Sequence, residues 1–284
     1  MKKFFVGIIM ILILIVPIAG ASNILLNNPK KETTSDTSNV EFTHKVFVEY
    51  GTMTTCPYCV TASSQLNSIY NSGDQDFDYV TLVWNKANKN VRTRLKDLGV
   101  TSVPDVYFDG KFKHIIGAQD DETPYREKIN ISGARVVPDI DMGMSVIWKM
   151  GGTLKITVTI NNKEAETYSG RLRVYITEKV SRWDDNGGTP FKYAAIDIPV
   201  NKTMSLTAGT TTYKMTWLGW INGFGDIKKD NIKVMATLFD ADTDYVVETA
   251  DKEPTTSSVT SEIPNLLLPD ILENLVDHFP LLNL

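Results

Sequence analysis

Residues 46–59 of the chain read VFVEYGTMTTCPYC. The opening stretch, Val46–Tyr50, is rich in β-branched and aromatic side chains, which predicts a strand. A helix is predicted from Pro57 to about Tyr70, because four small or apolar side chains recur there at helical spacing: Cys59, Ala62, Leu66 and Ile69. The cysteines at 56 and 59 therefore stand where a strand passes into a helix.

Cys56 and Cys59 are the only cysteines of the chain. Cys56 is expected at the N-cap of the helix and Pro57 at the first helical position, where a missing N–H costs nothing. The free amides of the first turn and the positive end of the helix dipole then face the Cys56 sulfur, which lowers the pKa of the thiol below its usual value of about 8.5. Cys59 lies one turn further on, where it can attack a mixed disulfide formed at Cys56.

Two other roles for the cysteine pair are open. A plain stabilising disulfide is disfavoured, because closing so short a loop stabilises a fold by only about 2 kcal/mol, against nearly 5 kcal/mol for a loop of about a hundred residues. Half of a zinc site would need further ligands from carboxylates or from His44, His114 and His278, and no second pair shows metal-ligand spacing. Neither a metal nor a cofactor is expected.

A second feature is the segment Thr101–Asp105, which reads TSVPD and opens another candidate strand. Pro104 cannot donate a hydrogen bond to a neighbouring strand and would normally weaken the strand. A cis peptide bond between Val103 and Pro104 would bring the start of this strand beside the start of the helix, and the Val103 backbone could then pair with an extended substrate. A trans proline that begins an edge strand is the alternative.

Further elements are predicted around these two features. Strands are expected at Tyr79–Trp84, Val103–Phe108 and Lys111–Ile116, and helices at Asn90–Leu98 and from Asp121 to about Ser132. Asp109-Gly110 is a hairpin turn signal. The order of elements is β-α-β-α-β-β-α.

This order, with Cys-Pro-Tyr-Cys at 56–59 and Val-Pro at 103–104, resembles the thioredoxin fold over about Glu41–Ser132. The resemblance implies a thiol–disulfide oxidoreductase in which Cys56 is the nucleophile and Cys59 the resolving thiol. It also implies a substrate groove that contains the cis-proline, with four residues in contact with substrate: Val103, Pro104, Pro57 and Tyr58. The Pro-Tyr dipeptide is similar to that of glutaredoxins, whereas Val-Pro is similar to extracytoplasmic proteins of the DsbA type.

Three positions depart from the pattern of the family. Thioredoxins bury an acid six residues before the first cysteine, where this chain has Tyr50, while Glu49 lies seven before. An extra residue before Cys56 would leave Glu49 as a proton relay; the alternative is a solvated glutamate on a strand. Thr55 replaces the usual tryptophan, and Tyr58 cannot supply the positive charge of a histidine, so a less extreme thiolate is expected than in the strongest oxidants.

After Gly133 the helical periodicity disappears. Seven short strands are predicted: Met142–Lys149, Thr153–Ile160, Gly170–Glu178, Ala194–Pro199, Thr211–Thr216, Ile232–Phe239 and Tyr245–Glu248. The fold class expected is thus an α/β thioredoxin fold over 44–134, with a central mixed sheet and flanking helices, followed by an all-β immunoglobulin-like sandwich over 135–250. Residues 251–284 are expected to form a linker and a short amphipathic helix from Pro269, docked on its own domain.

The first residues of the chain have the pattern of a targeting signal. Met1-Lys2-Lys3 is followed by an uncharged run over 4–19 and by Ala19-Gly20-Ala21, the layout of a signal peptide over 1–21 that is either cleaved or kept as an anchor. Residues 22–43 are expected to be a flexible tether. Both alternatives predict an extracytoplasmic protein, secreted or anchored at the cell envelope, where disulfides persist.

The formal net charge of −5 and the lack of a long basic run argue against nucleic-acid binding. The predicted activity is disulfide exchange with protein clients, and a separate redox partner protein is expected because the chain has no third cysteine. The direction of electron flow is left open. The alternative is a surface-interaction protein whose β-sandwich carries the function and whose cysteine pair is structural or vestigial.

Overall fold

The computed structural model describes residues 41–256. Its first part contains β1 (Val46–Thr52), α1 (Cys59–Ser72), β2 (Phe77–Val83), α2 (Lys89–Leu98), β3 (Asp105–Phe108), β4 (Lys113–Ile116) and α3 (Thr123–Gly133). A short 3₁₀ helix, η1 (Trp84–Lys86), follows β2. The predicted order of elements is confirmed.

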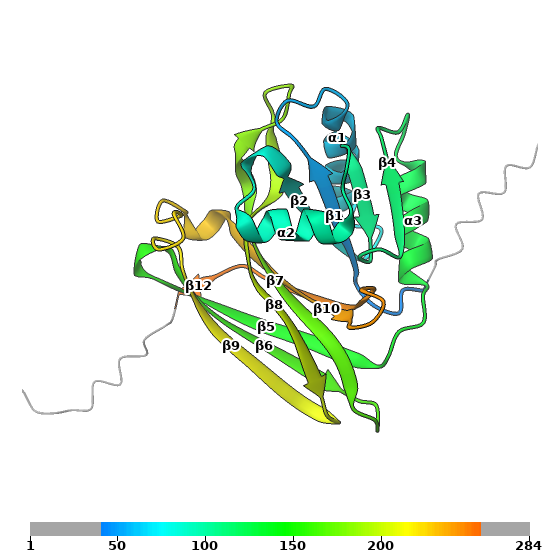
Figure 1. Cartoon of the computed structure of the whole chain (residues 1–284), viewed down its shortest axis with the longest axis vertical. Coiled ribbons are helices and arrows are strands. Elements are labelled where there is room, and N and C mark those ends of the chain that lie inside the picture. Colours follow the sequence, from blue (N-terminus) through cyan, green and yellow to red (C-terminus); the bar gives the residue numbers. More distant parts are fainter. Residues whose placement is uncertain (1–40, 257–284) are drawn as a thin grey trace, which may run out of the picture. The chain divides into compact units, whose positions relative to one another are not determined.

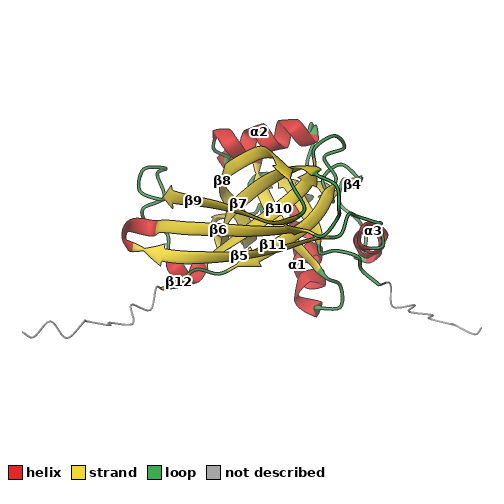
Figure 2. Ribbon diagram, turned by 90° about the horizontal axis from the view of Figure 1, so that it is seen from below, coloured by secondary structure: helices red, strands yellow, loops and turns green. Residues whose placement is uncertain are grey.

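The strands of this part form a mixed sheet. β1 is parallel to β2 and antiparallel to β3, and β3 is antiparallel to β4. Helices α1 and α3 cover one face and α2 the other (Figure 2). The alternation of side chains along β1 sets this division, because Val48 packs with α1 and α3 whereas Phe47 packs with α2. This is the arrangement of a thioredoxin fold.

The second part is built almost wholly of strands. They are β5 (Ile140–Lys149), β6 (Thr153–Asn162), β7 (Tyr168–Asp184), β8 (Pro190–Leu206), β9 (Gly209–Leu218), β10 (Ile232–Asp240), β11 (Val246–Lys252) and β12 (Thr255–Thr256). Short 3₁₀ turns lie at η2 (Met150–Gly152) and η3 (Lys229–Asn231). All seven predicted strands are present, and most are longer than expected.

Two sheets enclose one apolar core in this part. The sheet β12-β5-β6-β9 packs against β7, β8, β10 and β11, with Ile156 and Trp217 from the first and Val174 and Leu238 from the second fully or nearly buried (Figure 2). The chain therefore combines a thioredoxin-like domain with a β-sandwich. An immunoglobulin-like topology for this sandwich stays a prediction.

The two parts share one sheet. Its strand order is β11-β10-β7-β8-β2-β1-β3-β4, so the sandwich strands continue directly into the thioredoxin-like strands (Figure 1). The junction is a single parallel pair, Thr81 with Ala194, and the Thr81 hydroxyl also donates to the carbonyl of Lys192 across 2.7 Å. The predicted boundary near residue 134 follows the end of α3, but the sheet does not divide there.

The first and last described residues make contacts with the rest of the fold. Thr43, expected in the tether, donates its backbone N–H to the Gly133 carbonyl across 2.8 Å. The prediction of a linker from residue 251 is wrong for 251–256, which complete β11 and form β12. The predicted signal segment, residues 22–40 of the tether and the C-terminal helix lie outside the described residues. No helix within 41–256 has the length and apolar character to cross a membrane.

Candidate functional site

The two cysteines form a disulfide between the end of β1 and the start of α1. Their Cα atoms lie 5.3 Å apart. Cys56 is 6% exposed and Cys59 is completely buried. Of the two bonded cysteines, only Cys56 therefore retains any exposure to solvent.

The turn that holds the disulfide precedes the helix rather than opening it. The backbone N–H of Cys59 donates to the carbonyl of Cys56 across 3.3 Å, and α1 begins at Cys59 with Tyr58 in its N-cap position. The prediction of a helix from Pro57 with Cys56 as its N-cap was therefore wrong by two residues. The hydrogen-bonded turn over 56–59 still places Cys56 before the free amides of the first helical turn.

The peptide bond between Val103 and Pro104 is cis, so the alternative of a trans proline is wrong. The Val103 carbonyl oxygen lies 3.7 Å from the Cys56 sulfur. Because that sulfur belongs to a disulfide and carries no proton, this is a contact and not a hydrogen bond. The Pro104 carbonyl accepts from the Gly117 N–H across 2.8 Å, which ties this segment to the residue after β4.

The outer rim of the disulfide is exposed. Tyr58 is 70% exposed and its neighbour Pro57 is also exposed, while Val103 is half-buried beside the disulfide. The structure thus brings together Cys56, Pro57, Tyr58, Cys59 and the Val103–Pro104 pair, as the sequence predicted. Their roles in binding a client are taken up below.

The structure corrects the interpretation of Glu49 as a proton relay. Side chains alternate along β1, and Tyr50 faces the disulfide, where its hydroxyl donates to the Cys59 carbonyl across 2.8 Å. Glu49 points to the opposite face, where both its oxygens accept from Arg94 of α2, at 2.8 and 2.6 Å. The solvated alternative is also wrong, because Glu49 is fully buried and accepts from the Tyr175 hydroxyl of β7.

Sequence reasoning missed one residue that supports the site. Asn85, in η1 after β2, accepts from the Thr54 N–H across 3.2 Å and donates to the Thr54 hydroxyl across 2.7 Å. These bonds hold the loop between β1 and Cys56. A single asparagine after a strand is too common to be singled out without coordinates.

Two of the three histidines named as potential metal ligands lie within the described residues. His44 is buried and bonded to Asp109, and His114 is exposed on β4. Within the part of the chain that the structure describes, no three His, Cys, Asp or Glu side chains are grouped to hold a metal ion.

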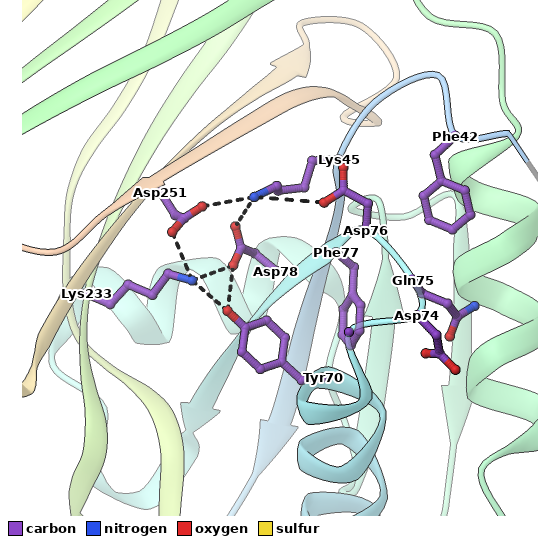
Figure 3. A pocket seen from close by; sticks show the side chains of 11 residues that line it. Phe42, Lys45, Tyr70, Asp74, Gln75, Asp76, Phe77, Asp78, Lys233 and Asp251 are labelled. Carbon is purple, nitrogen blue, oxygen red and sulfur yellow. Dashed lines mark hydrogen bonds and ion pairs between the residues drawn. The ribbon is translucent and has the colours of Figure 1, made fainter.

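A separate cavity of about 600 Å³ lies at the other end of α1 (Figure 3). Lys233 of β10 donates to Asp78 of β2 at 2.7 Å and pairs with Asp251 of β11 at 3.0 Å, and Lys45 pairs with Asp251 at 3.0 Å. Burial works to raise the pKa of Asp251, but the two lysines outweigh it and lower the pKa to about 2. Burial raises the pKa of Asp78 in spite of the same lysines. These lysines and aspartates form ion pairs that join the sandwich to the thioredoxin-like domain.

Comparisons with known proteins agree with the fold of the first part. The sequence model of the glutaredoxin family matches residues 47–113, which include both cysteines and Pro104. No curated protein matches the chain.

Two solved structures resemble the chain over most of its length. HBP35 of Porphyromonas gingivalis superimposes with a TM-score of 0.62 at 14% identity, over 78% of this chain and 80% of that one. A protein of Agrobacterium tumefaciens superimposes with a TM-score of 0.50 at 14% identity, over 75% of this chain and 95% of that one. At such identities the likeness concerns the fold alone. The glutaredoxin-like domain and its close cysteine pair indicate a capacity for thiol redox chemistry.

Proposed function

We propose that this protein is an extracytoplasmic thiol–disulfide oxidoreductase that exchanges disulfides with protein clients through Cys56 and Cys59. The observation that carries the proposal is the unequal exposure of the two bonded cysteines beside Pro104: Cys56 keeps 6% exposure next to the exposed Pro57 and Tyr58, whereas Cys59 has none. A purely structural disulfide gains nothing from such a placement. Exchange requires it, because only one of the two sulfurs meets the client.

The reduced protein acts in two displacements. The Cys56 thiolate attacks one sulfur of a client disulfide, so that a Cys56–client disulfide forms and the other client sulfur leaves as a thiolate. The Cys59 thiolate then attacks the Cys56 sulfur, which restores the Cys56–Cys59 disulfide and releases the second client thiolate. Two electrons pass to the client; the same steps in reverse oxidise a client dithiol.

Support for the setting of this reaction comes from the sequence. An extracytoplasmic location rests on the predicted signal segment over 1–21. With Cys56 and Cys59 as the only cysteines, the spent pair needs a separate redox partner protein to recharge it. Disulfide exchange needs no further cofactor, because the electrons move between sulfur atoms.

The client segment is proposed to lie across the exposed Pro57-Tyr58 dipeptide and the Val103 backbone. Tyr58 offers an apolar ring with a polar tip at the rim, and the Val103 carbonyl oxygen lies 3.7 Å from the Cys56 sulfur. An extended client can meet all of these groups, because strand-like backbone leaves its polar groups free for pairing.

Trapping with single-cysteine variants tests the proposal. Cys59→Ser should accumulate mixed disulfides with clients through Cys56, because the second displacement is blocked. Cys56→Ser should accumulate none, because its remaining thiol is buried, and the double variant is the matched control. Equal trapping by the two single variants would contradict the assigned roles.

The surface-interaction alternative predicts different thiol behaviour. It requires an ordinary thiol pKa near 8.5 for Cys56 and no reduction of insulin by the reduced protein. An alkylation rate that reaches its plateau at a pH well below 8 would argue for the redox function instead. Cell fractionation tests the location, since an extracytoplasmic protein should be recovered from the envelope or the medium and not from the cytoplasm.

A further inference from the structure

The hairpin between β7 and β8 reaches from the sandwich to the thioredoxin-like domain (Figure 1). Near its root, Ala194 pairs with Thr81 of β2, and Phe191 is buried with Val83 of the same strand. The pairing of β7 and β8 shifts register between Val180 and Asp184, and Asp184 then pairs with Pro190 directly before the turn at the tip. The root is therefore fixed on the sheet that carries the disulfide.

The tip of the hairpin, residues 185–189, is internally braced. One carboxylate oxygen of Asp185 accepts from the N–H groups of Gly187 and Thr189, at 2.8 and 3.0 Å. The Asp185 N–H donates to the Thr189 carbonyl across 2.8 Å, and Asp185 itself is buried. The turn thus presents Asn186 and Gly188 to solvent from a frame held by its own hydrogen bonds.

Gly187 at the tip is exposed but lies close to the first turn of α1. A Cβ atom placed on Gly187 would be 3.5 Å from a methyl group of Val60, which is ordinary van der Waals contact, and Val60 follows Cys59 directly. In the shared sheet the order is β8-β2-β1-β3, and the redox turn follows β1. The disulfide accordingly has the Val103 segment on one side and the hairpin on the other.

We propose that the tip of the β7–β8 hairpin is a specificity determinant of the redox site, which limits the bulk of the client surface that can reach Cys56. This inference rests on the proposed function. Disulfide exchange needs three sulfurs in line, so the client backbone must come close to Cys56. A braced turn beside the disulfide hinders a broad folded surface and leaves a small disulfide unaffected.

The test compares a protein disulfide with a small one. The reduced protein is assayed against insulin and against the small aromatic disulfide DTNB, and the ratio of the two rate constants is the readout. Asn186→Trp adds bulk at the exposed tip without removing any of the bonds made by Asp185. It should lower the ratio by roughly fivefold or more, the effect of about 1 kcal/mol in the barrier, with the DTNB rate nearly unchanged.

Ala165→Trp is the matched control. Ala165 is exposed in the loop before β7, at the opposite end of a 17-residue strand that is roughly 50 Å long.

Asp185→Ala is expected to have the opposite effect. It removes the hydrogen bonds to the N–H groups of Gly187 and Thr189 that hold the turn, so the ratio of the insulin rate constant to the DTNB rate constant should rise.

A ratio for Asn186→Trp equal to that of the native protein, or an equal fall with Ala165→Trp, would overturn the inference. A native protein that reduces neither substrate would overturn the proposed function together with it, so the two failures are distinguishable.

Discussion

The hydroxyl of Tyr50 donates a hydrogen bond to the backbone carbonyl of Cys59 across 2.8 Å. Burial raises the pKa of Tyr50, so the hydroxyl stays a donor throughout the physiological range. The bond ties β1 to the first residue of α1, directly beneath the disulfide. At the position where thioredoxins bury an acid, this chain therefore has a neutral group that holds the backbone.

Tyr50→Phe removes that bond and leaves the shape of the side chain almost unchanged. We expect the free energy of unfolding of the oxidised protein to fall by about 1 kcal/mol, the usual net value of a buried hydrogen bond. Urea unfolding measures it. Tyr58→Phe is the control, because Tyr58 is largely exposed, and an equal loss in that variant would contradict the role given to Tyr50.

Glu49→Gln separates a structural carboxylate from a proton relay. Glu49 faces Arg94 and Tyr175, on the face of the sheet away from Cys59. We therefore expect the pH profile of the reaction with DTNB to keep the midpoint of the native protein. If the folded variant reacts with a different pH midpoint, Glu49 would act as a proton relay after all.

Arg94→Met tests the buried ionic network between the two parts of the chain. Arg94 pairs with Glu49 at 2.6 Å and with Asp244 at 2.7 Å, and Asp244 also pairs with Arg173 of β7 at 2.7 Å. Loss of Arg94 leaves the Glu49 carboxylate buried without its ion pair, which should cost about 3–5 kcal/mol in urea unfolding.

The double variant Glu49→Met with Arg94→Met is the control for that network. It should lose much less stability than the two single losses added together, because both charges leave at once. Additive losses would show that the two side chains do not act as a pair.

Asp251→Asn should have an effect that depends on pH. A carboxyl whose pKa is lowered from 3.8 to about 2 adds stability above its unfolded value and loses that stability as the pH falls toward 2. We expect the variant to lose about 1–2 kcal/mol at pH 6, after allowance for the partial exposure of Asp251, and the difference from the native protein to shrink below pH 4. Urea midpoints at several pH values measure it.

Asp230→Asn is the comparison for this pH series. Asp230 pairs with Lys229 at 3.3 Å on an exposed turn, so its loss should change stability little at any pH. A constant loss for Asp251→Asn across the whole range would contradict the lowered pKa.

Gly110→Ala should be costly for two reasons. Gly110 has φ of +66°, and a Cβ atom there would overlap the backbone carbonyl of Asp244, which neither residue can relieve by changing a rotamer. Gly117 also has a positive φ, +86°, but with open space around it, so Gly117→Ala measures the conformational cost alone, about 1–2 kcal/mol. In thermal or urea unfolding, Gly110→Ala should lower the free energy of unfolding much more than Gly117→Ala does. Equal losses would argue against the close approach of Gly110 to the Asp244 carbonyl.

The local structure of this chain was largely predictable from its residues. Cys56 and Cys59 at the strand-to-helix junction, Pro104 at the next strand and the alternating runs after Gly133 each depend on neighbours within a few positions. The spacing of apolar side chains along a strand or a helix is a property of a short segment, so it can be recognised in the sequence without knowledge of the rest of the chain. The strands came out longer than expected because β-pairing extends polar ends such as Lys202–Leu206, which their own pattern does not mark.

Other features depend on which distant segments meet. Alternation along β1 says that Glu49 and Tyr50 face opposite ways, but only the packing of α1 and α2 decides which of them meets the disulfide. The joining of two predicted domains into one sheet depends on a single pair between residues 81 and 194. The ion pairs of Asp244 and Lys233 and the approach of Gly187 to Val60 likewise join residues far apart in the chain. Such contacts are decided by tertiary structure, because a charged or small residue carries no local signal of the partner that it will meet.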